Sequence, residues 1–266
     1  MIPKKIHYCW FGGNPLPDSA KKCIDSWKKF CPDYEIIEWN ESNFDVNCCA
    51  YVREAYQAKK WAFVSDVARL YIIAQNGGIY LDTDVELIKP LDSLMEYEGF
   101  MGFENNEYVA LGLGFGAVKG NYLIQELVET YQTLSFIKED GTYNQKPITR
   151  YTTETLMKHG LQPNGQYQKI EGIEVLSKEY LCPFDFETGK LKITPNTFSI
   201  HWFDATWFDP AMQYQKKLTW KLNKALPQSA AYNISRFIAI MKFRGIGEAF
   251  RKVVKKFHTH ANPQED

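Results

Sequence analysis

Hydrophobic residues in the first third of the chain follow two alternating spacings. Short apolar or aromatic runs over 6–11, 35–39 and 79–81 predict buried strands. Apolar residues at helical spacing predict a helix that starts at Asp18 or Ser19 and is closed by Pro32, and two more helices over 50–58 and 62–75. Strands and helices therefore alternate, which is typical of an α/β fold with a mostly parallel sheet.

The rest of the chain continues with short strands and longer helices. Apolar runs predict strands over 85–88, as an extension of the 79–81 strand, and over 100–103, 113–118, 173–176 and 198–202. Helical spacing predicts helices over 122–134, 149–158, 212–225 and 230–257, the last with a weak point at Gly245 and Gly247. We expect an α/β domain over 1–210 and a helical C-terminal extension over 211–266.

Composition places the chain among globular proteins. With 266 residues, 45% of them hydrophobic, and a formal net charge of -1, it has enough apolar residues for a sizeable core and no excess charge for binding nucleic acid. Six cysteines without C-x-x-C spacing predict reduced thiols and no zinc site. Because no signal-like or membrane-spanning apolar run is recognised, we expect a cytoplasmic location.

The low net charge hides a basic C-terminal segment. Eleven Lys and Arg residues lie between positions 208 and 260, against two acidic residues. Apolar residues such as Ile234, Phe237 and Met241 are interleaved with these cations. This pattern predicts peripheral contact with the anionic inner face of the cell membrane. The alternative is a solvated helix that packs on the rest of the protein.

Two carboxylates follow the predicted strand over 79–81, in the sequence Asp82-Thr83-Asp84. In an extended chain Asp82 and Asp84 point the same way, whereas Thr83 points the opposite way. Ligands of open α/β sheets bind beyond the carboxyl ends of the strands. Paired carboxylates suit Mn²⁺ or Mg²⁺, which share their coordination with substrate phosphates. The pattern predicts a divalent-cation site for a ligand that carries a phosphate.

Other uses of the acidic pair are less compatible with the sequence. An EF-hand loop is excluded because Leu87 and Ser93 stand where Gly and Glu are required. A phosphohydrolase of the haloacid dehalogenase type would use Asp82 as nucleophile, but Glu86 stands where Thr or Val is expected. A non-catalytic module that binds a sugar nucleotide or carbohydrate is a further alternative, and both this module and the phosphohydrolase stay open.

Three segments in the first third of the chain resemble the family 32 glycosyltransferases: IPKKIHYCWFGG over 2–13, AFVSDVAR over 62–69 and NGGIYLDTD over 76–84. This family includes bacterial capsule and exopolysaccharide transferases, yeast Golgi mannosyltransferases and, more distantly, the glucosylating clostridial toxins. Beyond Val118 the similarity is confined to short stretches, and Lys146-Pro147 departs from the family pattern. The resemblance implies a GT-A type catalytic domain over 1–210, a nucleotide-sugar donor and retention of anomeric configuration.

The resemblance also assigns residues to the donor pocket. Trp10 would stack on the nucleobase, and Tyr80 and Thr83 would line the nucleotide-sugar pocket. Asp66 and Arg69 would hold the hydroxyl groups of the donor sugar, with Arg69 also near the phosphates. Taken alone, Trp10 is equally compatible with a core position, whereas an ordinary helical ion pair would be the preferred interpretation of Asp66 and Arg69.

Residues for the metal are assigned in the same way. By similarity Asp84 would bind the cation directly, and Asp82 would bind it directly or through water. His201, at the end of the strand over 198–202, is the expected third ligand, although a single histidine is also common as a structural residue. Trp207 would close over the diphosphate.

The implied reaction moves a hexose from UDP-galactose or UDP-glucose to a saccharide, for which we expect a lipid-linked oligosaccharide in surface polysaccharide synthesis. Asp84, Arg69 and Asp66 are the residues expected to carry the chemistry. We recognise no nucleophile and therefore predict a same-face route that relies on charge stabilisation and acceptor positioning. The glycines over 112–116 match a loose dinucleotide fingerprint without its βαβ unit, so we expect a strand close to the substrates.

Overall fold

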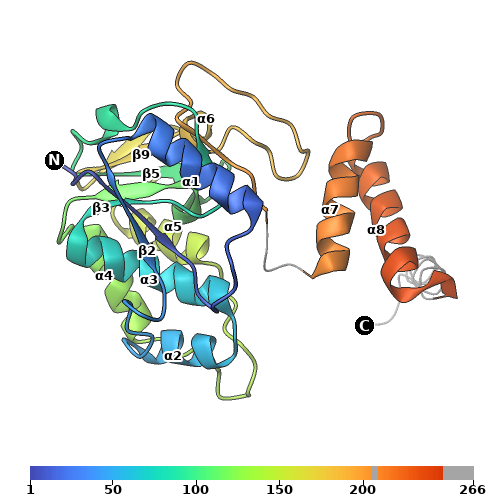
Figure 1. The fold of residues 1–266 in the computed structure, drawn as a ribbon, viewed down its shortest axis with the longest axis horizontal. Helices are drawn as coiled ribbons and strands as arrows, with labels where there is room; N and C mark the ends of the chain where they lie inside the picture. The colour runs from blue at the N-terminus through green and yellow to red at the C-terminus, as the bar shows by residue number, and fades with distance from the viewer. Residues whose placement is uncertain (205–208, 248–266) are drawn as a thin grey trace. The chain divides into compact units, whose positions relative to one another are not determined.

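The computed structural model describes residues 1–204 and 209–247 and divides the chain into two compact units. Unit 1 contains Met1–Phe184 and Lys192–Phe203, whereas unit 2 contains Asp185–Leu191 and Asp204–Asp266. Unit 1 holds the sheet and α1 to α6, and unit 2 holds α7 and α8 (Figure 1). The second unit therefore takes a short segment from the middle of the sequence in addition to the C-terminal residues.

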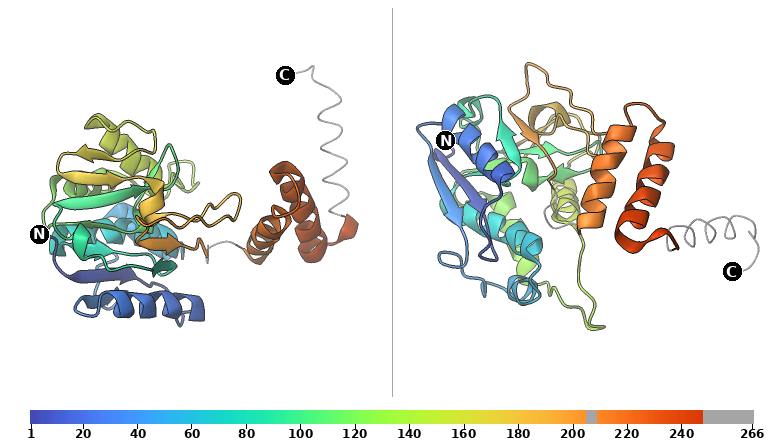
Figure 2. Two further views of the ribbon diagram at one scale, coloured as in Figure 1. Left: turned by 90° about the horizontal axis from the view of Figure 1, so that it is seen from above. Right: turned by 45° about the vertical axis from the view of Figure 1, so that its right-hand side comes forward.

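An eight-stranded mixed sheet forms the centre of unit 1, and its strands run side by side in Figure 2. The order is β2-β1-β3-β7-β5-β9-β8, and β6 pairs with β5. Five strands, β2, β1, β3, β5 and β9, run in one direction, whereas β7, β8 and β6 run in the other. The strand bounds are β1 Lys5–Cys9, β2 Glu35–Trp39, β3 Gly78–Tyr80, β5 Gly99–Phe103, β6 Val109–Ala110, β7 Phe115–Ala117, β8 Gln168–Ile170 and β9 Ile173–Leu176. The α/β class predicted from the sequence is confirmed.

Helices cover both faces of this sheet because side chains alternate along its strands. Tyr80 of β3 points into the core formed with α2 to α5, whereas Ile79 and Leu81 point into the core formed with α1 and α6. The helices are α1 Asp18–Phe30, α2 Ala50–Gln57, α3 Trp61–Asn76, α4 Tyr122–Gln132, α5 Ile148–Lys158 and α6 Lys178–Leu181. Two 3₁₀ turns, Asp92–Leu94 and Leu111–Leu113, complete the elements of unit 1.

The chain leaves the main sheet after β3, which corrects one prediction. Strand β4, Val85–Leu87, does not extend β3 but pairs antiparallel with β10, Ser199–His201, in a separate two-stranded sheet. A turn separates β3 from β4, in which the Val85 N–H donates to the Asp82 carbonyl at 3.0 Å. Asp82 and Asp84 therefore lie in this turn and not in an extended strand.

Local sequence signals explain most helix ends. Gly77 ends α3 with φ of 64°, a left-handed conformation that costs glycine little. Helix α1 starts where expected but follows Pro17, and neither Asp18 nor Ser19 acts as a side-chain cap, contrary to the prediction. The short elements β6, β8 and α6 were not predicted, because runs of two to four residues carry no clear periodicity.

Unit 2 is built on an antiparallel pair of helices, α7 Pro210–Leu222 and α8 Gln228–Arg244, which lie side by side (Figure 2). Asp209 caps α7 by accepting a hydrogen bond from Met212 N at 2.8 Å. Between the helices the hydroxyls of Thr219 and Ser235 are 2.6 Å apart. Helix α8 ends at Gly245, which has a φ of 89°, so the predicted weak point terminates the described helix; the prediction beyond Gly247 lies outside the described residues.

The segment Asp185–Leu191 packs against α7 within unit 2. Trp220 donates its indole N–H to the Phe186 carbonyl at 2.8 Å, and Asn223 donates to the Thr188 carbonyl at 3.2 Å. Among the helices of the described residues, none is long and apolar enough to cross a lipid bilayer.

Candidate metal and nucleotide-sugar site

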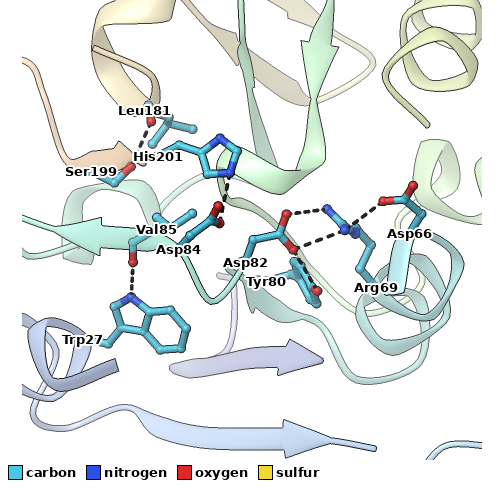
Figure 3. A network of polar contacts seen from close by, with 10 residues as sticks. All are labelled: Trp27, Asp66, Arg69, Tyr80, Asp82, Asp84, Val85, Leu181, Ser199 and His201. Atoms are coloured by element: carbon cyan, nitrogen blue, oxygen red, sulfur yellow. Dashed lines mark hydrogen bonds and ion pairs between the residues drawn. The ribbon is translucent and has the colours of Figure 1, made fainter. Parts of the chain in front are cut away.

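The turn after β3 brings three side chains with metal-binding atoms together. One ligand atom from each of Asp82, Asp84 and His201 lies within 4.8 Å of the other two. Asp82 and Asp84 come from the turn, and His201 comes from β10, which pairs with β4 directly after the turn (Figure 3). The three residues predicted as metal ligands are therefore neighbours, although the turn, and not an extended strand, places the carboxylates.

Asp82 is bound on its other side by Arg69 of α3. The two guanidinium nitrogens of Arg69 each lie 3.2 Å from one oxygen of the Asp82 carboxylate. Arg69 also lies 2.9 Å from Asp66, one helical turn away, and its guanidinium carbon is 4.8 Å from the centre of the Tyr80 ring. The Tyr80 hydroxyl donates to Asp82 at 3.1 Å. Arg69 thus joins two carboxylates and an aromatic face in one network (Figure 3).

Burial controls the charges of this network. Arg69 is 4% exposed. Burial works to lower the pKa of Arg69, but the negative charges of Asp82 and Asp66 outweigh it and raise the pKa, so the guanidinium stays positive. Burial raises the pKa of Asp66 to about 6, although Arg69 opposes this rise. The pKa of Asp82 is also raised, first by burial and further by the nearby charge of Asp84.

His201 is buried beside Asp84 and has one ring nitrogen without a partner. Its Nε2 lies 3.1 Å from Asp84 Oδ1, and its Nδ1 is buried with no hydrogen-bond partner among the described residues. Burial works to lower the pKa of His201, but the charge of Asp84 and the hydrogen bond to it raise the pKa overall.

The donor set fits a divalent cation. Two carboxylates and one imidazole match the oxygen and nitrogen ligands of Mn²⁺, and a metal-bound histidine is deprotonated at the nitrogen that binds. A buried imidazole with an unsatisfied nitrogen is uncommon unless it has a functional reason. His201 directs Nε2 at Asp84, so Nε2 is the nitrogen that would share a cation with the two carboxylates.

Gly112 is a site residue that the sequence analysis did not single out. A Cβ atom at this position would overlap Asp82 Oδ2 and would approach Arg69 Nη1 at 3.3 Å. The backbone at Gly112 therefore lies directly against the carboxylate, and only glycine leaves the Asp82 side chain in place. The expectation of a strand close to the substrates stays a prediction: Gly112 lies in the 3₁₀ turn Leu111–Leu113, and the glycines at 112, 114 and 116 were the available signal for its approach to Asp82.

Helix α1 holds the strand that follows Asp84. Trp27 donates its indole N–H to the Val85 carbonyl at 2.7 Å, and the Leu87 N–H donates to Ser26 Oγ at 2.9 Å. From the other side, the Trp202 N–H donates to the Asp84 carbonyl at 3.0 Å. Sequence reasoning missed these supporting contacts because Ser26 and Trp27 lie almost sixty positions before the turn and show no motif.

The remaining predicted residues occupy varied environments. Trp10 directly follows β1, is partly buried against the core that α1 covers, and donates its indole N–H to the Asn14 carbonyl at 2.5 Å. Tyr80 is buried beneath Arg69, and Thr83 is partly buried in the turn. Trp207 lies outside the described residues.

A cavity of about 560 Å³ opens near Trp10. Its lining includes Asn14, whose carbonyl accepts the bond from Trp10. The other lining residues are Gly12, Gly13, Glu41, Tyr56, Lys59 and Trp61. This cavity and the acidic turn both follow the carboxyl ends of neighbouring parallel strands, β1 and β3, which is where ligands of α/β sheets bind.

Residues 17–101 match the family described as a glycosyltransferase sugar-binding region containing the DXD motif. This segment contains Asp66, Arg69, Asp82 and Asp84. This part of the chain is therefore similar to the DXD-type sugar-binding region of glycosyltransferases. The match supports a glycosyltransferase and agrees with the geometry, in which all four side chains of this segment belong to one polar network together with His201.

Some of the similar curated proteins are named as glycosyltransferases. The chain is 29% identical over 149 residues to inositol phosphoceramide mannosyltransferase 3 of Schizosaccharomyces pombe, covering 51% of this chain and 38% of that protein. It is 27% identical over 178 residues to subversion of eukaryotic traffic protein A of Legionella pneumophila, covering 53% of this chain and 26% of that protein. The similarity thus spans well under half the length of each relative.

Among solved structures, the PaToxG glycosyltransferase is similar with a TM-score of 0.44 and 20% identity, covering 59% of this chain and 69% of that chain. A glycosyltransferase involved in glycosylation of the major capsid of PBCV-1 is similar with a TM-score of 0.40 and 10% identity, covering 86% of this chain and 98% of that chain.

Proposed function

We propose that this protein is a metal-dependent, retaining glycosyltransferase that moves a hexose from a nucleotide sugar to a saccharide acceptor. The observation that carries the proposal is the cluster of Asp82, Asp84 and His201, whose ligand atoms lie within 4.8 Å of one another. The two carboxylates come from the turn within residues 17–101, and the histidine comes from β10. A solvated acidic turn would not bury an arginine and a histidine against its two carboxylates.

Asp84 and His201 would hold Mn²⁺ or Mg²⁺ directly, and Asp82 would hold it directly or through water. When bound, the cation neutralises the charge that develops on the departing nucleoside diphosphate. Arg69 adds a permanently charged guanidinium next to the cluster, at the place where the phosphates of a metal-bound donor would lie. Its ion pairs with Asp66 and Asp82 hold it in position before a donor binds, so its placement requires no reorganisation.

The nucleoside would occupy the cavity near Trp10. An aromatic face suits a nucleobase, and Trp10 lies at the end of β1 beside Asn14, which lines the cavity. One carboxylate oxygen of Asp66 is paired with Arg69, which holds the side chain in place. Asp66 would then accept hydrogen bonds from hydroxyl groups of the donor sugar. Tyr80 and Thr83 would complete the donor pocket, and Trp207 would close over the diphosphate.

Transfer would follow the same-face route, in which the acceptor hydroxyl attacks from the side that the diphosphate leaves and its proton passes to the departing phosphate oxygen. The residues would contribute by binding and orientation: the cluster would hold the cation that neutralises the phosphates, Arg69 would add a positive charge beside them, and Asp66 would orient the sugar. Positioning of this kind supplies a large part of the rate enhancement in group-transfer enzymes.

UDP-galactose and UDP-glucose are the first donors to test, and the mannosyltransferase relatives add nucleotide donors of mannose. A lipid-linked oligosaccharide of surface polysaccharide synthesis is the proposed acceptor. The basic helices of unit 2 would bring the enzyme to the anionic inner face of the cell membrane, where such an acceptor is found.

A donor panel tests the proposal. Each nucleotide sugar is incubated with the protein and Mn²⁺, and release of the nucleoside diphosphate is measured with and without added saccharides. We expect release from one donor class, loss of release with EDTA, and loss in Asp84→Ala. Release of phosphate from generic phosphoesters without any donor would favour the phosphohydrolase, and donor binding without release or transfer would favour the non-catalytic module.

A further inference from the structure

Unit 2 contains a small pocket that the proposed transfer reaction does not use. It has a volume of about 140 Å³ and lies between the start of α7 and the second half of α8. Arg236, Ile240 and Arg244 line it from α8, four residues apart, so they form one stripe along the helix. The other lining residues are Asp209, Ala211, Met212, Gln215 and Ala239.

The charges of this pocket favour an anion. Two guanidinium groups face it, against one carboxylate, Asp209, which caps α7 by accepting from Met212 N at 2.8 Å. Neither Arg236 nor Arg244 forms an ion pair with an acidic residue in the described parts of the chain. An arginine with free donors binds phosphate through two parallel hydrogen bonds, which a single lysine cannot reproduce.

Large apolar side chains are exposed at one lining residue and at two positions next to Arg244 in the sequence. Met212, which lines the pocket, is 48% exposed, Phe243 beside Arg244 is 43% exposed, and Ile246 after the end of α8 is 64% exposed. Large apolar side chains next to cations suit the boundary between lipid headgroups and acyl chains. Binding of a soluble phosphate compound would not require these apolar side chains.

We propose that the pocket between α7 and α8 binds the phosphate group of an anionic phospholipid, with Arg236 and Arg244 as its donors. Met212, Phe243 and Ile246 then lie at the level of the upper acyl chains. This inference sharpens the membrane contact proposed above, because it replaces a diffuse attraction between charges by a defined headgroup site. It does not depend on the transfer reaction.

An arginine-to-lysine exchange in the full-length chain separates a defined site from a diffuse one. Arg236→Lys with Arg244→Lys keeps the net charge and removes the paired donors. We expect its affinity for vesicles of phosphatidylcholine with roughly one third phosphatidylglycerol, measured by co-sedimentation, to fall about tenfold. An affinity within about twofold of the unaltered chain overturns the proposal, because a diffuse attraction depends on charge alone.

A matched control removes two charges from the opposite side of α7. Lys217 and Lys221 are exposed and, by helical spacing, point away from Gln215, which lines the pocket. Lys217→Gln with Lys221→Gln is expected to lose less affinity for the same vesicles than the arginine-to-lysine variant, although it has lost two charges and that variant has lost none. A loss equal to or greater than that of the arginine-to-lysine variant contradicts a site at the pocket.

Two further measurements complete the test. Calorimetric titration with inorganic phosphate is expected to show no saturable binding up to about 10 mM, and saturable binding below about 1 mM would assign the pocket to a soluble phosphate and overturn the lipid site. Donor hydrolysis in solution should be unchanged in both double variants. A failure of the transfer proposal would instead abolish donor hydrolysis in the unaltered chain, so the two failures are distinguishable.

Discussion

Two buried histidines of unit 1 differ in how completely they are bonded. His7 of β1 is 0% exposed and His201 of β10 is 8% exposed. His7 uses both ring nitrogens: Nδ1 accepts from the Trp39 indole at 3.0 Å, and Nε2 donates to the Gly77 carbonyl at 3.0 Å. His201 uses Nε2 toward Asp84, and its Nδ1 has no hydrogen-bond partner within residues 1–204 and 209–247.

The electrostatics of the two histidines differ in the same way. Burial lowers the pKa of His7 to about 4, so the ring is neutral, whereas the pKa of His201 is raised by the carboxylate of Asp84 despite burial. A histidine whose two nitrogens are both satisfied by the fold has a structural role. His201 instead directs Nε2 toward a pair of carboxylates, an arrangement that a cation could share, and burial alone does not separate the two cases.

The largest expected effect concerns Asp84, the carboxylate beside His201 in the candidate metal site. Asp84→Ala should lower transfer at least about a thousandfold, because it removes the ligand to which His201 is bonded and leaves the charge of the departing diphosphate less well neutralised. Nucleoside diphosphate release at saturating Mn²⁺ measures the loss. Near-normal turnover of this variant would show that the cluster is not the metal site.

Replacement of His7 should lower the stability of the protein and leave its activity unchanged. His7→Phe keeps the size of the side chain but leaves the Trp39 indole N–H and the Gly77 carbonyl unpaired, which we expect to cost about 3 kcal/mol of unfolding free energy at pH 7. Urea unfolding measures this cost. Activity of the folded fraction should stay within about twofold of the unaltered chain, as His7 does not contact the cluster.

The cost of His7→Phe should shrink in acid. The pKa of His7 falls from 6.5 to about 4 on folding, so between these values the unfolded chain takes up a proton that the folded chain does not. The unaltered protein therefore loses stability as the pH falls, by about 2.5 kcal/mol at pH 4.5 from this residue alone, and the variant does not. An equal difference between the two proteins at pH 7 and pH 4.5 would contradict the assigned neutral state of His7.

His201→Ala should show the reverse behaviour. We expect a loss of activity of about thirtyfold, together with a higher Mn²⁺ concentration for half-maximal rate, since one of three ligands is removed. The free energy of unfolding should change by less than about 1 kcal/mol, because the variant also removes a buried nitrogen without a partner. A normal Mn²⁺ requirement combined with a large loss of stability would place His201 with His7 as a structural residue.

The smallest expected effect concerns the backbone that borders Asp82. Gly112→Ala places a Cβ against the carboxylate and shifts Asp82 from Arg69, for which we expect about a tenfold loss of transfer. Gly120→Ala is the matched control, because it adds the same methyl group outside the site. Gly120 has a φ of 74°, and the atom nearest to an added Cβ is Gln125 Nε2 at 3.8 Å. This control should affect stability without affecting the Mn²⁺ requirement, and equal kinetic losses in both variants would remove Gly112 from the site.

Much of the site could be predicted from the sequence, because its residues lie in two local patterns. Asp66 and Arg69 share one side of a helix, as their spacing predicts. Asp82 and Asp84 are only two residues apart after a buried strand, so they stay close together although a turn, and not the predicted extended strand, places them. His201 was assigned only by resemblance, since its contact with Asp84 depends on the pairing of β10 with β4 over more than one hundred positions.

Long-range contacts account for most of what was missed. The departure of β4 from the main sheet depends on bonds from Ser26 and Trp27, and a hydrophobic run of three residues does not reveal which strand it will join. The closeness of Gly112 to Asp82 is likewise a tertiary contact. Short strands such as β6 and β8 gain their stability from the neighbours with which they pair and carry little pattern of their own.

Binding of Mn²⁺ tests the central claim most directly. Calorimetric titration of the full-length chain with Mn²⁺, in the presence of UDP or GDP, should give one saturable site that is at least about a hundredfold weaker in Asp84→Ala and unchanged in His7→Phe. Equal Mn²⁺ affinity in the unaltered chain and Asp84→Ala would contradict the assignment of Asp82, Asp84 and His201 as the metal site of a nucleotide-sugar transferase.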